Sequence, residues 1–314
     1  MRRVSVPGGS GPTLSRQYVK LCDVGDFDDP ELLAMIRELI PERDARAHAE
    51  RKAWELAMLA LFLRDVGRLH EGTEALAVGA GDERIVFWLA NRIGRVVATD
   101  IYGAGTFAEH EALASMLTEP RAHAPFPYRE DRLEVRYMDG RELAFADASF
   151  DVVFSVSSIE HFGGPADIAR SACELGRVLR PGGHAVILTE CFVRRHPLGA
   201  APVDFALRLA SLGRLRRRAT PRRRAGVDVL TARELERLIV RPSGLALLQP
   251  LDRSISAASY ENIAQLRPGS DPEPATGSFY PHVLLRFRGS VFTSVCLAMQ
   301  KPMRGLGLEP SPPD

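Results

Sequence analysis

The sequence predicts an α/β sandwich whose sheet is mostly parallel and ends in an antiparallel hairpin. Short apolar runs alternate with amphipathic segments between residues 74 and 188, and two extended runs, 283–287 and 291–299, flank Arg288-Gly289-Ser290. Strands that alternate with helices pair in parallel through right-handed crossovers, whereas two strands around a glycine turn form a hairpin. We therefore expect one three-layer domain.

The expected elements follow in chain order. A broad apolar stripe from Asp44 to Leu69 predicts a long amphipathic helix, which Trp54 anchors in the core. The alternation then predicts strands near residues 76 and 96 and at 133–137, 150–155 and 184–188, with helices at 84–92, 107–117 and 166–179. Pro181-Gly182-Gly183 predicts a turn before the last of these strands. A capping box of Thr231 and Glu234 predicts a helix over 231–240, before a strand at 245–248.

Composition marks the segments outside this pattern. Residues 1–43 form an N-terminal extension whose first thirty residues are polar and turn-rich, and we expect these to be loosely held. Residues 44–302 are expected to form the single domain, followed by a flexible tail at 303–314. Inside the domain, an arginine-rich insertion at 194–226 and a polar, proline-rich stretch at 254–282 interrupt the alternation.

Charge and cysteine content narrow the class of protein. A net charge of +1 gives no general attraction to nucleic acid or membranes, and no stretch approaches the ~20 apolar residues of a membrane span. The four cysteines lie far apart, so we expect reduced thiols in a cytoplasmic protein, and no structural metal. The residues after Met1 lack the apolar core of a secretory signal.

The most informative pattern is a glycine turn followed by an acid. Gly79-Ala80-Gly81 ends one apolar run, and Asp100 ends the next. Glycine lets the backbone turn sharply and approach a ligand, while a carboxylate at the next strand tip can accept both hydroxyls of a ribose. A dinucleotide-binding fingerprint would have its third glycine at position 84, where this chain has Arg84. The sequence therefore disfavours binding of a pyrophosphate, and with it the alternative function of an NAD(P)-dependent oxidoreductase.

Further motifs occur in a recognisable order. They are Ala77-Val78-Gly79-Ala80-Gly81-Asp82-Glu83, Asp100, Met138-Asp139-Gly140, the run from Phe150 through Ser157-Ser158-Ile159-Glu160-His161, and Leu179-Arg180-Pro181-Gly182-Gly183. Over roughly residues 70–190 the chain thereby resembles the class I S-adenosylmethionine-dependent methyltransferases. This resemblance implies a Rossmann-like sandwich with a seven-stranded sheet and S-adenosylmethionine as the cofactor.

The resemblance also implies a set of cofactor contacts. They are Gly79, Ala80, Gly81, Glu83, Asp100, Ile101, Met138, Asp139, Gly140 and Ser155. S-adenosylmethionine has no phosphate, so the glycine turn, Asp100 for the ribose and Asp139 for the adenine amine would suffice. The chain departs from the family in two places: Ala77 replaces an acid, and Glu83 replaces a third glycine. Glu83 or Glu55 could supply the missing carboxylate to the ammonium group of the ligand.

His161 is the candidate general base, because an imidazole titrates near ~6.5 and can accept a hydroxyl proton at neutral pH. Glu160 would orient it or bind the acceptor; the structural alternative is that His161 only hydrogen-bonds the loop backbone. We expect methyl transfer to a small molecule or glycan, at oxygen rather than carbon or nitrogen. A catalytically silent methyltransferase-like binding subunit is the alternative from another class.

The segments 194–226 and 254–282 are expected on the acceptor side, where His196 and His282 could line the pocket. The arginines of the first segment suit an anionic acceptor or peripheral contact with an anionic membrane, and a solvated loop is the structural alternative. We expect no nucleic acid partner, because aromatic residues are not interleaved with these arginines.

Overall fold

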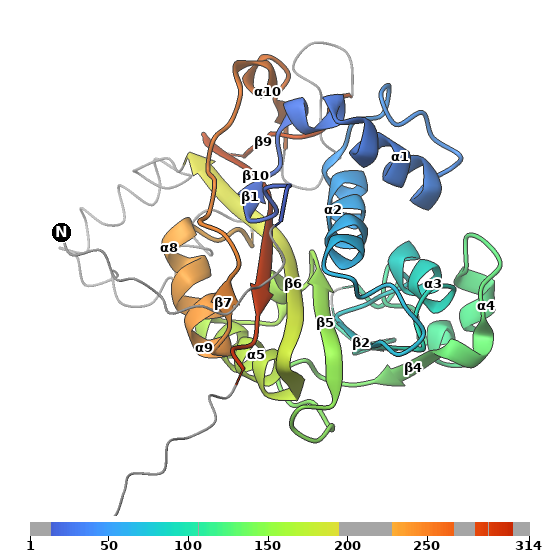
Figure 1. The fold of residues 1–314 in the computed structure, drawn as a ribbon. Coiled ribbons are helices and arrows are strands. Elements are labelled where there is room, and N and C mark those ends of the chain that lie inside the picture. The colour runs from blue at the N-terminus through green and yellow to red at the C-terminus, as the bar shows by residue number, and fades with distance from the viewer. Residues whose placement is uncertain (1–13, 106, 195–227, 267–279, 288, 304–314) are drawn as a thin grey trace, which may run out of the picture.

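The computed structural model describes residues 14–105, 107–194, 228–266, 280–287 and 289–303 (Figure 1). The arginine-rich insertion, apart from Arg194, lies outside these residues, and so do the middle of 254–282 and nearly all of the tail. Expectations for these segments, including that for His196, therefore stay predictions.

All strands of the described residues belong to one sheet. They are β1 (Lys20–Leu21), β2 (Glu74–Val78), β3 (Arg95–Asp100), β4 (Leu133–Tyr137), β5 (Phe150–Val156), β6 (Leu179–Arg194), β7 (Ala246–Leu247), β8 (Ala264–Gln265), β9 (Leu285–Phe287) and β10 (Ser290–Gln300). The order is β4-β3-β2-β5-β6-β10-β9-β8, and β1 and β7 also pair with β10.

The pairing confirms the expected sandwich. Strands β4, β3, β2, β5 and β6 are parallel, while β10 is antiparallel to β6 and to its hairpin partner β9. The described residues place ten strands in this sheet, so the expected number of seven is too small. Four of the ten strands are short: β1 and β7 pair with the long β10, β9 is the hairpin partner of β10, and β8 pairs with β9.

Helices cover both faces of the sheet. They are α1 (Pro30–Leu39), α2 (Arg51–Asp65), α3 (Arg84–Ala90), α4 (Pro120–His123), α5 (Pro165–Val178), α8 (Ala232–Leu235), α9 (Arg241–Ser243) and α10 (Ala257–Glu261). Short 3₁₀ turns are η1 (Val24–Asp28), η2 (Ala114–Leu117), η3 (Glu130–Arg132) and η4 (Ile159–His161), and η6 (Glu236–Val240) is a π-helical turn. Helices α5, α8 and α9 lie together on one side of the sheet, and α1, α2 and α3 lie on the other (Figure 1). Within the described residues, no helix is long and apolar enough to span a bilayer.

The core explains why these segments fold as they do. The central strands are buried on both faces, as the near-continuous apolar runs of a covered parallel sheet require. Helix α2 is buried almost all round, and Trp54 is fully buried, which confirms its role as an anchor. The capping box at the start of α8 is also confirmed, because the Thr231 hydroxyl accepts a hydrogen bond from the Glu234 backbone N–H at 3.2 Å.

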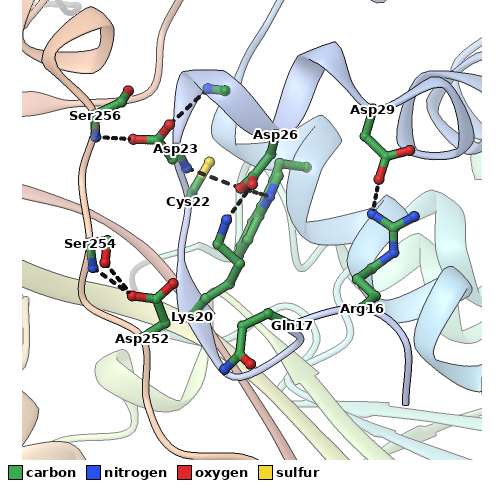
Figure 2. A network of polar contacts seen from close by, with 12 residues as sticks. Arg16, Gln17, Lys20, Cys22, Asp23, Asp26, Asp29, Asp252, Ser254 and Ser256 are labelled. Atoms are coloured by element: carbon green, nitrogen blue, oxygen red, sulfur yellow. Dashed lines mark hydrogen bonds and ion pairs between the residues drawn. The ribbon is translucent and has the colours of Figure 1, made fainter. Parts of the chain in front are cut away.

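The expectation of a loosely held N-terminal segment is wrong for residues 14–30. Figure 2 shows the polar contacts that fix it: the Asp23 carboxylate accepts hydrogen bonds from the backbone N–H groups of Gly25 and Ser256, at 2.8 and 2.7 Å. Asp26 forms an ion pair with Lys20 and accepts a 2.8 Å hydrogen bond from the Trp54 indole. These contacts join the segment to α2 and to the start of α10.

Two further expectations are corrected. Residues 107–117 do not form a helix: only η2 is helical, because tertiary hydrogen bonds compete, among them those from Gly103 N–H to the Ala112 carbonyl and from Asp82 N–H to the Glu111 carbonyl. The turn at 181–183 lies inside β6, which begins at Leu179. There Gly182, with a φ of +76°, accommodates a shift in register against β5.

Candidate functional site

A cavity of about 830 Å³ lies at the carboxyl ends of the parallel strands. The chain leaves β2 towards β3 and β4 but later runs from β5 to β6 on the other side, so β2 and β5 form the switch point of the sheet. Open α/β sheets bind ligands in the crevice at this point. Two walls of the cavity differ in character.

We call the first the strand-end wall: Gly79, Gly81, Asp100, Met138 and Gly140, which lie at or just beyond the carboxyl ends of β2, β3 and β4. We call the second the charged wall: Arg51, Lys52 and Glu55 of α2, Glu190 of β6 and His161 of η4.

The glycine turn is built for close packing. Gly79 has a φ of +67°, and a methyl group added to it would come within 2.5 Å of the Ser158 Cβ atom and 2.8 Å of the Phe162 ring. Gly81 has a φ of +49°, and a methyl group there would lie 2.7 Å from the Glu111 carbonyl oxygen. The sequence predicted close approach by a ligand; in the structure, neighbouring chain segments already make that approach.

Asp100 ties the turn to β3. Its carboxylate accepts hydrogen bonds from the backbone N–H groups of Gly81, at 2.9 Å, and Ile101, at 2.7 Å. Burial raises the pKa of Asp100, and these two hydrogen bonds oppose the shift. Each oxygen accepts one of these hydrogen bonds and has a second lone pair, so the carboxylate can still accept hydrogen bonds from the hydroxyl groups of a ligand in the cavity.

The Phe162 ring packs against two glycines of the strand-end wall. A methyl group added to Gly140 would lie 2.6 Å from this ring, which also packs against Gly79.

Beside Gly140, Asp139 also lines the cavity, and its carboxylate accepts a hydrogen bond from the Arg141 guanidinium, with 2.5 Å between Oδ2 and Nη2. This hydrogen bond holds the pKa of Asp139 below its ordinary value.

In the charged wall, Lys52 meets two acids. Its ammonium lies 2.6 Å from the Glu83 carboxylate and 3.4 Å from that of Glu55. Burial lowers the pKa of Lys52, but the charges of Glu83 and Glu55 outweigh it and raise the pKa overall. Glu55 is buried and accepts hydrogen bonds from the hydroxyls of Ser157, at 2.7 Å, and Ser294.

His161 lies in the loop after β5 and faces Asp228, with 3.1 Å between Nδ1 and Oδ2. Its ring also packs edge-on against Phe107, with centroids 4.9 Å apart. Burial lowers the pKa of His161, but the hydrogen bond with Asp228 and the charge of Glu160 outweigh it, so the pKa is raised. Asp228 therefore takes the orienting contact that the sequence suggested for Glu160.

The lining residues carry more acids than bases: eight carboxylates and five arginine or lysine side chains. Each of the five cations already has an acid partner. The pairs are Arg43 with Glu50, Arg51 with Glu190, Lys52 with Glu83, Arg84 with Glu42, and Arg141 with Asp139. The described part of the cavity therefore suits a neutral or cationic ligand.

The structure brings most of the expected site residues together. Gly79, Ala80, Gly81, Glu83, Asp100, Ile101, Met138, Asp139, Gly140 and His161 all line the cavity. Three other candidates are not among its lining residues: Ser155 and Glu160 are buried, and His282 is partly buried beside α2. Burial raises the pKa of Glu160 to about 7. No group of three or more potential metal ligands occurs in the described segments.

Sequence reasoning missed Arg51, Lys52, Glu190 and Asp228 as functional residues. The first two are charged positions directly before the long apolar run of α2, which is a signal that could have drawn attention to them. Glu190 reaches the cavity through the long β6. Asp228 contacts the cavity-lining His161 from a segment that returns beside β6 at the Cys191–Leu230 bridge. No local sequence pattern predicts the positions of Glu190 and Asp228 relative to the cavity.

The residues present fit S-adenosylmethionine. The buried Asp100 carboxylate lies beside the glycine turn, where it can accept the ribose hydroxyls of the ligand. The acidic lining suits a ligand that carries a positively charged sulfonium and no phosphate. A dinucleotide pyrophosphate fits less well, because the lining arginines and Lys52 are already paired with carboxylates.

Comparison with known proteins supports the same assignment. Residues 76–187 match the family described as "Methyltransferase domain". Methyltransferase GfsG of Streptomyces halstedii is 28% identical over 199 residues, which cover 62% of this chain and 66% of the relative. The 27-O-demethylrifamycin SV methyltransferase of Amycolatopsis mediterranei (strain S699) is 41% identical over 58 residues, or 18% of this chain and 20% of the relative. The alignments thus span less than two thirds of either relative.

Among solved structures, the YcgJ protein of Bacillus subtilis aligns with a TM-score of 0.43 and 15% identity, covering 78% of this chain and 98% of that one. The family match coincides with β2 to β6, the strands that build the switch point and its glycine turn. Residues 76–187 therefore form a class I S-adenosylmethionine-dependent methyltransferase domain.

Proposed function

We propose that the protein transfers the methyl group of S-adenosylmethionine to a hydroxyl oxygen of a neutral small molecule or glycan. The observation that carries this proposal is the His161–Asp228 pair, because His161 lines the same cavity as Asp100 and the glycine turn. The name of one relative, the 27-O-demethylrifamycin SV methyltransferase, supports an oxygen acceptor.

When bound, S-adenosylmethionine supplies an electrophilic methyl group on a sulfonium, and the electron pair of the broken carbon–sulfur bond stays on sulfur. Asp228 accepts the Nδ1 proton of His161, so Nε2 is the nitrogen that can take the acceptor's hydroxyl proton. The deprotonated hydroxyl oxygen of the acceptor then forms the new bond to the methyl carbon. Asp100 and the glycine turn hold the cofactor so that the two reacting groups stay aligned.

A neutral acceptor follows from the charges of the cavity. Every lining arginine or lysine among the described residues is paired with a carboxylate, so an anionic acceptor would have to displace an acid from its partner. The anionic acceptor and the membrane contact expected from residues 194–226 depend on arginines outside the described segments. They stay predictions about that insertion.

We also propose that the protein works in the cytoplasm. Cys22, Cys191 and Cys296 are buried as free thiols, and Cys173 is an exposed free thiol. Burial raises the pKa of the Cys191 thiol to about 12, which keeps it protonated and unreactive. Four reduced cysteines are typical of a reducing compartment.

The test is turnover of the full chain with S-adenosylmethionine and a panel of neutral hydroxylated small molecules and glycans, with 27-O-demethylrifamycin SV as a further acceptor. We expect release of S-adenosylhomocysteine together with an O-methyl ether identified by mass spectrometry. His161→Gln should lower kcat by roughly 100-fold or more with an accepted substrate. His110→Gln, which changes an exposed histidine outside the lining residues, is the matched control. A product methylated at carbon or nitrogen, or full turnover by His161→Gln, would contradict the proposal.

A further inference from the structure

An ion pair joins two elements across the edge of the cavity. Lys52 comes from the first turn of α2, and Glu83 comes from the residue that precedes α3, with 2.6 Å between Nζ and Oε1. Both residues line the cavity, and their side chains are 41% and 25% exposed. A ligand in the cavity can therefore reach both charges.

A second acid strengthens the negative side of this cluster. The Glu55 carboxylate lies 3.4 Å from the Lys52 ammonium and is held in place by the hydroxyls of Ser157 and Ser294. Ser157 adopts a φ of +48°, a left-handed conformation that residues other than glycine seldom adopt. Backbone strain of this kind concentrates at functional sites, where the surrounding structure maintains it.

The position of the pair matches a gap in the sequence motif. Position 77 holds alanine where related domains often have an acid, so the end of β2 offers no carboxylate to a ligand's ammonium group. Glu83 lies four residues beyond Gly79, on the same turn, and Lys52 faces it. The pair thus presents one negative and one positive group beside the glycine turn.

We propose that Lys52 and Glu83 are the docking site for the amino-acid end of the methyl donor. Lys52 binds the α-carboxylate, Glu83 binds the α-ammonium, and Glu55 keeps Lys52 in place. The inference rests on the proposed function, because the ligand is S-adenosylmethionine or its demethylated product. A zwitterion can separate the pair at little cost, since each charge exchanges one partner for another and a part-exposed ion pair contributes little by itself.

The alternative is a purely structural role, in which the ion pair only fixes α2 to the turn before α3. The two roles differ in which ligands they affect. Docking of the amino-acid end matters for S-adenosylhomocysteine but not for 5′-methylthioadenosine, which has the same adenosine and sulfur but lacks the amino acid. A structural role would change the affinity for both ligands alike.

The experiment is isothermal titration calorimetry of the full chain with these two ligands. We expect Lys52→Met and Glu83→Gln each to weaken S-adenosylhomocysteine binding roughly 10-fold or more, as loss of a charge-assisted hydrogen bond predicts, with little change for 5′-methylthioadenosine. Arg64→Met is the matched control, because Arg64 lies at the other end of α2, is 43% exposed and is also paired with acids. It should leave both affinities unchanged.

A charge swap distinguishes the two roles by a second route. The double variant Lys52→Glu with Glu83→Lys keeps an ion pair between the two elements but reverses its direction. The docking proposal predicts that this variant still binds S-adenosylhomocysteine more weakly than the wild type while its affinity for 5′-methylthioadenosine is unchanged, whereas a purely structural ion pair would restore the wild-type affinity for both ligands. Equal effects on both ligands, or no effect, would overturn the inference. Failure of the wild-type protein to bind S-adenosylmethionine or either probe would instead overturn the proposed function on which it rests.

Discussion

The two walls of the cavity are held together in different ways. The strand-end wall is fixed mainly by backbone N–H groups over short stretches of sequence: Gly81 donates to Asp100 nineteen residues away, and Arg141 donates to Asp139 two residues away. The charged wall is fixed by side chains that are distant in sequence. The separations are 67 residues for His161 and Asp228, 139 for Arg51 and Glu190, and 239 for Glu55 and Ser294.

This difference indicates which wall can change its ligand specificity through substitutions. A wall made of backbone turns depends on the fold and tolerates few substitutions, because an added side chain collides with neighbouring chain. A wall made of paired side chains can change its charge and shape while the sheet stays the same, since single surface substitutions seldom destabilise a domain strongly. We therefore expect the strand-end wall to govern stability and the charged wall to govern ligand choice.

The largest expected effect is on the glycine turn. Gly79→Ala should lower the free energy of unfolding by about 3–5 kcal/mol, because it adds a left-handed alanine and a collision with Ser158 and Phe162. Gly67→Ala is the control: its φ is +68°, but an added methyl group meets nothing within 4 Å. It should lose only about 1–2 kcal/mol. Equal losses in urea unfolding would show that packing at the turn is unimportant.

The next effect concerns Glu160, which lies behind the charged wall. Its pKa is about 7 in the folded protein against an ordinary value of 4.5, because burial disfavours the charged carboxylate. The folded state therefore binds this proton more tightly than the unfolded state, and the resulting stability is lost as the pH rises from 4.5 through 7. The loss amounts to at most about 3 kcal/mol.

Glu160→Gln removes this titration. The variant should be more stable than the wild type at about pH 8 and lose that advantage at about pH 5, as measured by urea unfolding at both values. The same difference in unfolding free energy at the two pH values would mean that Glu160 does not titrate between them.

A smaller effect is expected at the distant pair of the charged wall. Asp228→Asn should lower the pKa of His161 towards its ordinary value of 6.5, because the carboxylate that favours the imidazolium is gone. NMR titration of imidazole nitrogens, with the signal assigned through His161→Gln, measures this without an acceptor. A pKa that does not move, or that rises, would show that Asp228 does not face His161 in solution.

The smallest effect is expected at the Asp139–Arg141 pair, in the turn after β4. Arg141→Ala should change the free energy of unfolding by less than about 1 kcal/mol, since Asp139 and Arg141 are about 40% exposed and exposed ion pairs contribute little. Thermal or urea unfolding would detect a larger loss. Such a loss would mean that the turn after β4 depends on side chains more than the comparison of the two walls allows.

The same contrast explains what the sequence could predict. The strand at 133–137 and the capping box of Thr231 follow from short patterns, and both occur where expected. The glycine turn and Asp100 lie close together because parallel strands bring their carboxyl ends to one edge. The expected helix at 107–117 fails because its backbone groups bond to the glycine turn and its neighbours instead.

Prediction reached less far in the charged wall. The sequence indicates His161 as a candidate because it follows a strand. Its partner Asp228 comes after a long insertion, so no spacing rule connects the two residues. Glu190 was hidden within a strand that extends six residues beyond its predicted end at Leu188. Contacts of this kind depend on tertiary packing, which single-sequence patterns do not encode.

The central claim is that Asp100 and the glycine turn hold the adenosine of S-adenosylmethionine, and calorimetric titration of that ligand tests it most directly. We predict that the wild-type protein binds it and that Asp100→Asn weakens binding by roughly 10-fold or more, because an amide cannot accept hydroxyl protons on both sides. Absence of binding by the wild type, or equal affinity of Asp100→Asn, would contradict the account.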